Sequence, residues 1–304
     1  MKENILITGG SGLLALNWAS TMREKFNITL GLHNRKVSLK DTKSILLNLD
    51  TIQALTKAFE ELQPQLVIHA AGLTSVEACE SNPALAKYIN VDLTKNLVIA
   101  CAKLNIPMVY ISTDHLFSGD ESLIEEDFPV SPMNVYAMTK AEAEAYVQHT
   151  YPEALIIRTN FYAWGTSYRH SFSDMVINNL RAGKKISLFK DIFYTPILVE
   201  TLVHKVHELI QKKAKGIFNV VGDDRISKYD FGLKIAREFN LDNDLIEAEK
   251  IIDRPSLVNR PHDISLSNKK VTIYLGKKMG GLDQHILKLK AQEAIGLTQE
   301  LQAL

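Results

Sequence analysis

Short apolar runs alternate with stretches of helical periodicity through the first half of the chain. The apolar runs lie at 5–7, 28–32, 66–71, 108–112 and 155–158. The helical patterns lie at about 12–25, 51–62, 83–104 and 134–148. Strands that are apolar on both faces and separated by helices are typical of a parallel sheet covered on both sides. The pattern predicts an α/β fold with a doubly wound parallel sheet of the Rossmann type.

The second half of the chain has a less regular pattern. It predicts a strand at 216–222, between two glycines, and a helix after Ser227, which is placed to cap it with Asp230 in the reciprocal position. No repeat or Gly/Ser linker marks a boundary. We predict a main domain of residues 1–165 plus about 191–221, and a smaller C-terminal lobe of about 166–190 and 222–304. The pattern does not place the last 30 or so residues.

The composition argues against several classes of protein. The 304 residues are 46% hydrophobic and 23% charged, which is ordinary for a globular protein. Lys and Arg number 35, as do Asp and Glu, and this balance argues against a nucleic-acid or anionic-membrane binder. Two cysteines make no disulfide framework, no apolar run is long enough for a membrane span, and no signal peptide is expected at the N-terminus. A cytoplasmic protein is therefore predicted.

A glycine-rich segment, Thr8-Gly9-Gly10-Ser11-Gly12-Leu13-Leu14-Ala15, follows the first predicted strand and opens the first helix. Gly9 permits a tight turn, Gly12 lets the backbone approach a pyrophosphate, and the free N–H groups of the helix start favour that anion. A plain turn is the alternative for a bare glycine cluster. The strand before it and the helix after it indicate a dinucleotide site. The candidate contacts are Gly9, Ser11, Gly12, Leu13 and Leu14.

The loop after the second predicted strand bears on which dinucleotide is bound. An acid that accepts from the ribose 2′-hydroxyl is expected there, but the chain has His33-Asn34-Arg35-Lys36. Arg35 and Lys36 could pair with a 2′-phosphate. The alternative is a solvated basic loop. The sequence favours NADP(H) over NAD(H), which stays open, with Asn34 and Arg35 as candidate contacts.

Tyr136 and Lys140 are four residues apart in a helical segment and so share a face. Tyr274 and Lys278 have the same spacing, so spacing alone is not specific. Only the first pair follows a strand that ends in Ser112-Thr113-Asp114, near the carboxyl edge of the sheet where ligands bind. The histidines show no metal-ligand spacing, and no metal essential to catalysis is predicted.

Four motifs together resemble the extended short-chain dehydrogenase/reductase superfamily. They are Thr8-Gly-x-x-Gly12-x-x-Ala15, Ala70-Ala71-Gly72, Ser112-Thr113-Asp114 and Tyr136-x-x-x-Lys140, in matching order and spacing. Within that superfamily the chain is most similar to the dTDP-4-dehydrorhamnose reductase family. That similarity lies in residues 69–77 with 90–92, residues 112–119, Thr195-Pro196 with Glu200, and residues 260–266. It covers residues 1 to about 270.

The resemblance implies a catalytic role for three residues. Tyr136 would protonate the substrate oxygen, and Thr113 would orient that oxygen. Lys140, together with the charge of the oxidised nicotinamide, would lower the pKa of the Tyr136 phenol, and it would also hold the nicotinamide ribose. It also implies that Ala70, Ala71, Gly72, Asn48 and Leu49 border the cofactor. The implied activity is NADP(H)-dependent reduction of a 4-keto group on a nucleotide-linked deoxysugar, within polysaccharide biosynthesis, with the smaller C-terminal lobe as the substrate-binding lobe.

The sequence indicates the substrate-binding residues less specifically than the cofactor-binding ones. The candidate substrate-binding residues are Thr74, Ser75, His115, Asn160, Phe161, Tyr162 and Arg260. Aromatic residues after the strand at 155–158 could stack on a sugar or base, or pack between the two lobes. Arg260 could bind a substrate diphosphate or form a structural salt bridge. His115 stands where related dehydratases have a second acid, which argues against dehydration, although it could simply pack behind Leu116 and Phe117.

Two alternative functions stay open. One is an epimerase of the same superfamily, which retains its cofactor through the cycle. The other is a non-catalytic NADP-binding regulatory subunit, which the same family branch also contains. The intact Thr113, Tyr136 and Lys140 argue for catalysis. The predicted partner is a nucleotide-sugar substrate, with no nucleic acid and no membrane, and a homodimer is compatible with the superfamily.

Overall fold

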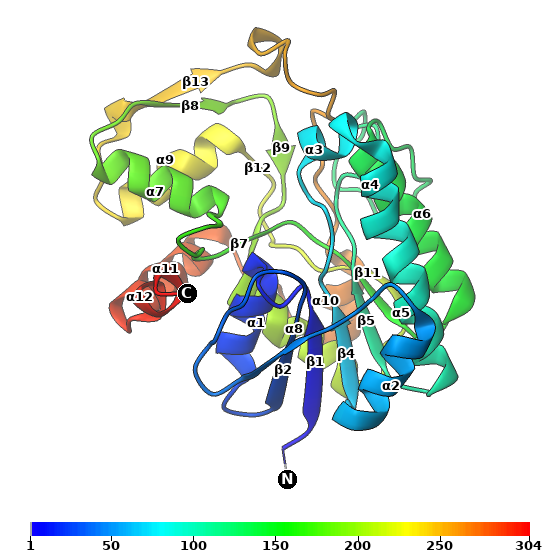
Figure 1. Cartoon of the computed structure of the whole chain (residues 1–304). Coiled ribbons are helices and arrows are strands. Elements are labelled where there is room, and N and C mark those ends of the chain that lie inside the picture. The colour runs from blue at the N-terminus through cyan, green and yellow to red at the C-terminus, as the bar shows by residue number, and fades with distance from the viewer. Residues whose placement is uncertain (1) are drawn as a thin grey trace.

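A seven-stranded parallel sheet lies at the centre of the computed structural model, which describes residues 2–304 (Figure 1). The spatial order is β11 (Gly216–Asn219), β6 (Leu155–Arg158), β5 (Met108–Ile111), β4 (Leu66–His69), β1 (Asn4–Thr8), β2 (Asn27–Leu32) and β3 (Lys43–Leu46). All neighbours in this sheet pair in parallel. The chain winds outward on both sides of β1, so the predicted doubly wound Rossmann-type fold is confirmed.

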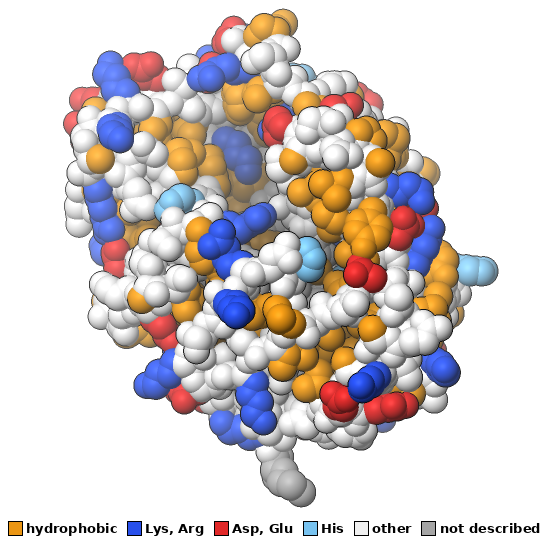
Figure 2. All heavy atoms as spheres, in the orientation of Figure 1, with side chains coloured by type: hydrophobic (Ala, Val, Ile, Leu, Met, Phe, Trp, Pro, Cys, Tyr) orange, Lys and Arg blue, Asp and Glu red, His pale blue; other side chains and the backbone are white. Residues whose placement is uncertain are grey.

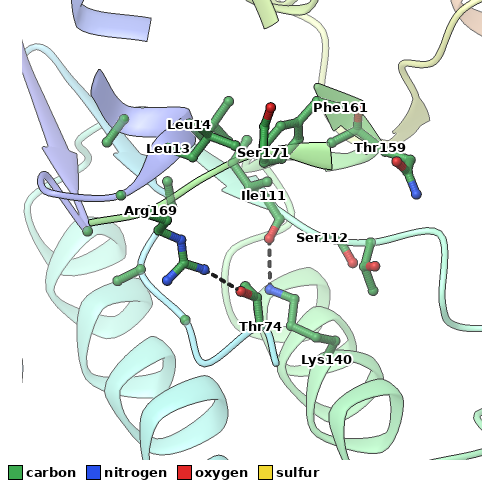
Figure 3. Close-up of a pocket in the computed structure, with 18 of the residues that line it drawn as sticks. Leu13, Leu14, Thr74, Ile111, Ser112, Lys140, Thr159, Phe161, Arg169 and Ser171 are labelled. Atoms are coloured by element: carbon green, nitrogen blue, oxygen red, sulfur yellow. Dashed lines mark hydrogen bonds between the residues drawn. The ribbon is translucent and has the colours of Figure 1, made fainter. Parts of the chain in front are cut away.

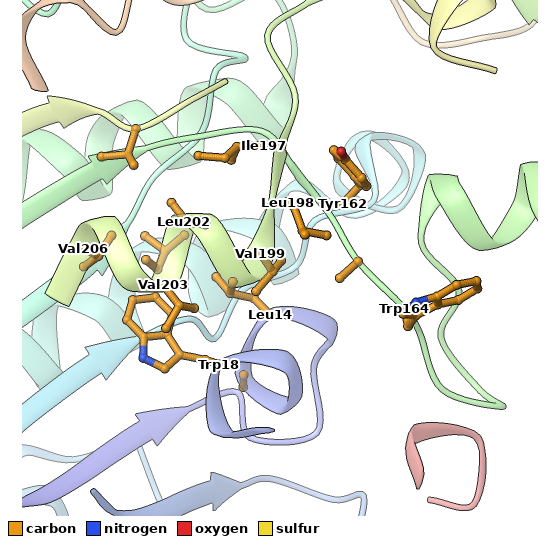
Figure 4. Close-up of a cluster of buried hydrophobic side chains, with 14 of the residues drawn as sticks. Leu14, Trp18, Tyr162, Trp164, Ile197, Leu198, Val199, Leu202, Val203 and Val206 are labelled. Atoms are coloured by element: carbon orange, nitrogen blue, oxygen red, sulfur yellow. The ribbon is translucent and has the colours of Figure 1, made fainter. Parts of the chain in front are cut away.

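Alternate residues of each strand enter two hydrophobic cores. Ile5 and Ile7 of β1 pack on one face of the sheet and Leu6 packs on the other. The first core includes α1 (Leu13–Met22) and α8 (Val199–Gln211), which meet over the sheet in Figure 4 through Trp18 and Val203. The second core takes in α2 (Ile52–Leu62), α5 (Leu93–Lys103) and α6 (Val135–Thr150). Both faces are covered, which explains why the strands are apolar throughout.

The helix predicted at 83–104 is divided into three parts. They are α4 (Pro83–Lys87), a π-helical segment η1 (Tyr88–Asp92) and α5. Asn82 caps α4 by accepting from Leu85 N, with Pro83 in the first turn. The π-helical segment holds the buried Asn90, which accepts from Leu73 N at 2.7 Å and donates to Thr139 Oγ1 at 3.0 Å. Asn90 thereby ties the loop after β4 to α6.

A second group of elements lies beyond the carboxyl end of the sheet (Figure 1). Its three small sheets pair β7 (Phe161–Tyr162) with β10 (Ile197–Leu198), β9 (Phe193–Tyr194) with β12 (Ile226–Ser227), and β8 (Ile186–Phe189) with β13 (Ile246–Glu249). Its helices are α3 (Val76–Ser81), α7 (Phe172–Arg181), α9 (Lys228–Glu238) and the 3₁₀ turns η2 (Asn243–Leu245) and η3 (Ile251–Asp253). Ser227 caps α9 by accepting from Asp230 N, as predicted, but the expected reciprocal bond differs, because Asp230 Oδ2 accepts from the Ser227 hydroxyl and not from its backbone N–H. The domain boundaries stay a prediction.

The C-terminal residues form hydrogen bonds that hold the segment after β7 in place. They form α10 (Lys269–Leu275), α11 (Leu282–Ala294) and α12 (Leu297–Gln302). Trp164 Nε1 donates to Leu289 O at 2.8 Å, and Gln302 Nε2 donates to Gly165 O at 3.0 Å. The residues that the sequence pattern could not place therefore fix the start of residues 163–172, which enter the cavity described below.

Within residues 2–304, no helix is both long and apolar enough to cross a membrane. The same part of the chain holds no group of three or more His, Cys, Asp or Glu side chains placed to share a metal ion. The homodimer stays a prediction.

Candidate active site

A cavity of about 640 Å³ opens at the carboxyl end of the sheet. Most of its lining follows strands β1, β4, β5 and β6, and the rest comes from α6, from Arg35 after β2 and from residues 168–172. The face in Figure 2 shows a hollow with Lys and Arg side chains along it. This is the edge at which open α/β sheets bind ligands.

The glycine loop is shaped for close approach by a ligand. Gly9 has φ +68°, and a Cβ there would lie 2.8 Å from the backbone N and Cα of Ala71. Gly12 donates its N–H to Gly9 O at 2.7 Å and caps α1 without a side-chain acceptor. The first N–H groups of α1 therefore meet no side chain at the cap, which is the arrangement that accepts a pyrophosphate. These residues fit a dinucleotide.

Residues 168–169 cross the cavity from the glycine loop to the loop after β4. Tyr168 donates its hydroxyl to Ser11 O at 2.9 Å, and the Arg35 guanidinium lies 3.9 Å from the centre of the Tyr168 ring. Arg169 Nη2 donates to Thr74 Oγ1 at 2.7 Å across the opening (Figure 3). Neither arginine forms an ion pair with a carboxylate in residues 2–304. Two unpaired guanidinium groups favour an anionic ligand.

The three predicted catalytic residues line the same cavity. Tyr136 and Lys140 share one face of α6, and Lys140 Nζ donates to Ile111 O, at the end of β5, at 2.8 Å (Figure 3). Thr113 comes two residues after β5 and is buried. The structure thus brings Thr113, Tyr136 and Lys140 to one place, although their catalytic roles stay predictions.

A buried ion pair holds these residues in position. Glu144, one turn beyond Lys140 on α6, pairs with Arg158 at the end of β6 at 2.6 Å. Ser112 Oγ donates to Glu144 Oε2 at 2.6 Å. The pair therefore fixes the ends of β5 and β6 against α6, and removing one partner would leave an uncompensated buried charge. The sequence analysis gave no role to Glu144 or Arg158.

Burial is the largest influence on the pKa values of Tyr136 and Lys140. It raises the pKa of the Tyr136 phenol, and the Thr113 hydroxyl, which hydrogen-bonds that phenol, opposes the rise. It lowers the pKa of Lys140 to about 7, although the Glu144 carboxylate opposes this. The predicted lowering of the Tyr136 pKa rests on Lys140 together with the nicotinamide charge and stays a prediction for the cofactor-bound protein, whereas the protein's own groups shift this pKa upward. The reason is that burial penalises the charged form of each group.

The substrate end of the cavity contains a buried carboxyl. Asp114 receives the Asn160 amide at 2.5 Å and the Thr113 hydroxyl at 3.2 Å. Burial raises the pKa of Asp114, and the neighbouring His115 opposes the rise. Burial lowers the pKa of His115, whose ring lies edge-on to Tyr136 with 5.7 Å between centres. A polar part of the cavity therefore adjoins the Tyr136 ring.

Most predicted contacts line the cavity, and six do not. Those that line it are Gly9, Ser11, Gly12, Leu13, Leu14, Arg35, Ala70, Ala71, Gly72, Thr74, His115, Asn160 and Phe161. Those outside its lining are Asn34, Asn48, Leu49, Ser75, Tyr162 and Arg260.

The surroundings of these six residues explain their positions. Ser75 caps α3 by accepting from Ala78 N, and Tyr162 lies in the core cluster of Figure 4 with its ring against Phe231. Arg260 forms an ion pair with Glu77. Asn34 and Asn48 are exposed and Leu49 is partly exposed, in the loops after β2 and β3.

The cavity also contains residues that the sequence analysis did not assign to it. They are Ala15, Val76, Ile111, Ser112, Asp114, Thr159, Tyr168, Arg169, His170, Ser171 and Phe172. Ser112 and Asp114 flank Thr113 in a motif already recognised. The Tyr168-Arg169-His170 run, polar and basic just after the predicted boundary at residue 165, was the available signal for the crossing segment.

Known proteins resemble this chain over nearly its whole length. The family model described as RmlD substrate binding domain matches residues 1–291. The probable low-salt glycan biosynthesis reductase Agl14 of Haloferax volcanii is 29% identical over 290 residues, which are 94% of this chain and 96% of that protein. Methionine adenosyltransferase 2 subunit beta of Mus musculus is 27% identical over 289 residues, which are 91% of this chain and 84% of that protein.

Among solved structures, dTDP-4-dehydrorhamnose reductase from Bacillus anthracis in complex with NADP superposes with a TM-score of 0.85 at 23% identity. The match covers 96% of this chain and 100% of that one. At this level of identity, the superposition shows a shared fold.

Proposed function

The chain belongs to the RmlD substrate binding domain family, and from that premise we propose that it is an NADP(H)-dependent oxidoreductase that reduces a 4-keto group on a nucleotide-linked deoxysugar. One observation carries the proposal. A single cavity joins the glycine loop to Thr113, Tyr136 and Lys140. This arrangement places a dinucleotide cradle beside a proton donor, as reduction of a ketone requires.

The cofactor end fits NADP(H) by its backbone and its charge. A Cβ at Gly9 would collide with the backbone of Ala71 and one at Gly12 would press on Gly9 O, so the tight turn requires glycine, and the turn presents the free N–H groups at the start of α1 to a pyrophosphate. Arg35, which is free of carboxylate partners in residues 2–304, would pair with the 2′-phosphate. When bound, the nicotinamide supplies the hydride.

The protein's own contribution is the proton and its placement. Tyr136 would give its phenolic proton to the substrate oxygen, and its raised pKa keeps the phenol neutral, as a donor must be. Thr113, which hydrogen-bonds Tyr136, would orient the oxygen. Lys140 is anchored to Ile111 O and would hold the nicotinamide ribose while its charge stabilises the phenolate left by the proton transfer.

The names of similar proteins support a sugar substrate. The relative from Haloferax volcanii is named a glycan biosynthesis reductase, and the superposed structure from Bacillus anthracis is a dTDP-4-dehydrorhamnose reductase. A nucleotide-linked 4-keto sugar is therefore the substrate we propose to try first.

A regulatory role is the second candidate, because the chain is 27% identical to methionine adenosyltransferase 2 subunit beta of Mus musculus. A protein of this kind would bind NADPH without turning over a sugar and would form a stoichiometric complex with an enzyme.

The test is oxidation of NADPH in the presence of dTDP-4-keto-6-deoxy sugars, with NADH in parallel and with a Tyr136→Phe variant as the control. Reductase activity predicts turnover that the variant loses. Tight NADPH binding without turnover would contradict the proposed substrate and favour the regulatory role. Turnover of a sugar without added cofactor would favour an epimerase.

A further inference from the structure

Lys228 places a cation beside the substrate end of the cavity. It is the first residue of α9, and its Nζ lies 3.3 Å from the centre of the Tyr194 ring and 4.9 Å from that of Phe172. Phe172 lines the cavity. The Lys228 charge also acts on Asp114 and His115, which line the same end.

The Lys228 ammonium has no oxyanion partner. Within residues 2–304, its Nζ forms neither a hydrogen bond nor an ion pair, and only aromatic rings contact it. The nearby Asp114 accepts from the Asn160 amide and the Thr113 hydroxyl, and among residues 2–304 it forms no hydrogen bond or ion pair with Lys228. Burial lowers the pKa of Lys228 to about 8, although Asp114 opposes this.

Removing such a cation from water costs free energy unless a ligand supplies an anionic partner for it. Aromatic faces stabilise an ammonium partly, but they do not replace the hydrogen bonds that it loses on leaving water. Arg260 adds to the positive field, since it lowers the pKa of both Lys228 and His115, while its own guanidinium pairs with Glu77. An unpaired, partly buried charge beside a cleft is a candidate binding position.

We propose that Lys228 binds an oxyanion of the substrate, either a phosphate or a carboxylate, beside Asp114 and His115. This inference rests on the proposed function, because it assumes that the substrate occupies the Tyr136 end of the cavity. Lys228 would determine specificity by favouring ligands that carry an oxyanion at this position and would take no part in the proton transfer. A substrate without an oxyanion at this position would leave the ammonium unpaired and bind weakly.

The experiment measures binding by calorimetry to the NADPH-loaded protein. One pair of probes is dTDP and thymidine, which tests a phosphate, and the other is UDP-glucuronate and UDP-glucose, which tests a sugar carboxylate. The variants are Lys228→Met and Lys228→Gln, the second of which keeps a polar end group without its charge. Lys184→Met, at an exposed lysine outside the cavity lining, is the matched control.

The proposal expects both Lys228 variants to bind one anionic probe about 10-fold or more weakly, as loss of a charge-assisted hydrogen bond predicts. The partner of that probe that lacks the tested anion, thymidine or UDP-glucose, should bind as before, and Lys184→Met should bind every probe as the wild type does. Weakened dTDP binding would assign a phosphate, and loss of a preference for UDP-glucuronate would assign a carboxylate.

Other results would overturn the inference. Unchanged affinities for all probes would do so, with or without a fall in thermal stability, and so would a wild type that binds NADPH but no probe. A wild type that does not bind NADPH would instead contradict the proposed function.

Discussion

The glycine-loop end of the cavity is lined mainly by two short stretches of contiguous chain, residues 9–15 and 70–72. The Tyr136 end is lined by side chains that are distant in the sequence, including Asp114, Asn160 and Phe172, with Lys228 beside them. At the first end the backbone makes the contacts, so sequence motifs describe it. At the second end the tertiary fold brings the side chains together, so substrate choice can change while the cofactor cradle stays the same.

Removing the proton donor should change turnover, which depends on the Tyr136 end, far more than NADPH affinity, which depends on the glycine-loop end. Tyr136→Phe takes away the phenolic proton and leaves the glycine loop untouched, so turnover should fall by about 10²- to 10⁴-fold. NADPH affinity, measured by fluorescence titration, should stay within about 2-fold because no cofactor phosphate contact changes. Comparable losses in both quantities would mean that the two ends are not independent.

Arg35 should affect only the cofactor end. Arg35→Gln should weaken NADPH binding by about 10- to 100-fold, because it removes a charge-assisted contact to the 2′-phosphate. NADH has no such phosphate, so its affinity should not change. The exposed Arg237 offers a matched control, and Arg237→Gln should leave both affinities unchanged. Equal losses for NADPH and NADH would refute the role given to Arg35.

Lys140 lies where the two ends meet, and its burial should appear in the pH dependence of stability. The folded protein loses this proton near pH 7 and the unfolded chain near pH 10.5. Between these values the unfolded chain binds more protons, so this group makes the free energy of unfolding rise with pH, by at most about 1.4 kcal/mol per pH unit.

Urea unfolding of the cofactor-free protein and of Lys140→Met, from pH 7 to pH 9, measures this effect. The wild type should gain stability relative to the variant as the pH rises. Parallel profiles would show that Lys140 is not the buried titrating group.

Ser75 should contribute neither to cofactor binding nor to substrate binding. The sequence analysis predicted that it binds substrate, whereas the structure has it capping α3. Ser75→Ala should lower the free energy of unfolding by about 1 kcal/mol. KM should not change. An increase in KM without a loss of stability would restore the original prediction.

The fold and the cofactor end could be predicted because their signals are local. The parallel sheet follows from apolar runs that alternate with helical patterns, and the cofactor-binding turn follows from Gly9 and Gly12 between a strand and a helix. Tyr136 and Lys140 are one helical turn apart, so a single segment also specifies their relative position.

The remaining features depend on contacts between distant segments. Arg169 meets Thr74, 95 residues away, and Trp164 meets Leu289 of the C-terminal helix α11. Tyr162 is aromatic and follows a strand as a sugar-stacking residue would, but the packing of Phe231 decides that it is core. The upward pKa shift of Tyr136 comes from burial, which no spacing of residues encodes.

The central claim is that this cavity joins a hydride donor to a nucleotide-linked keto sugar. The most direct measurement is mass spectrometry of the product formed from dTDP-4-dehydrorhamnose with each of the two NADPH forms deuterated at nicotinamide C4. The account predicts that one form transfers a single deuterium to the former keto carbon, with one NADPH consumed per product. A product without deuterium from either form, or no product while NADPH binds tightly, would contradict it.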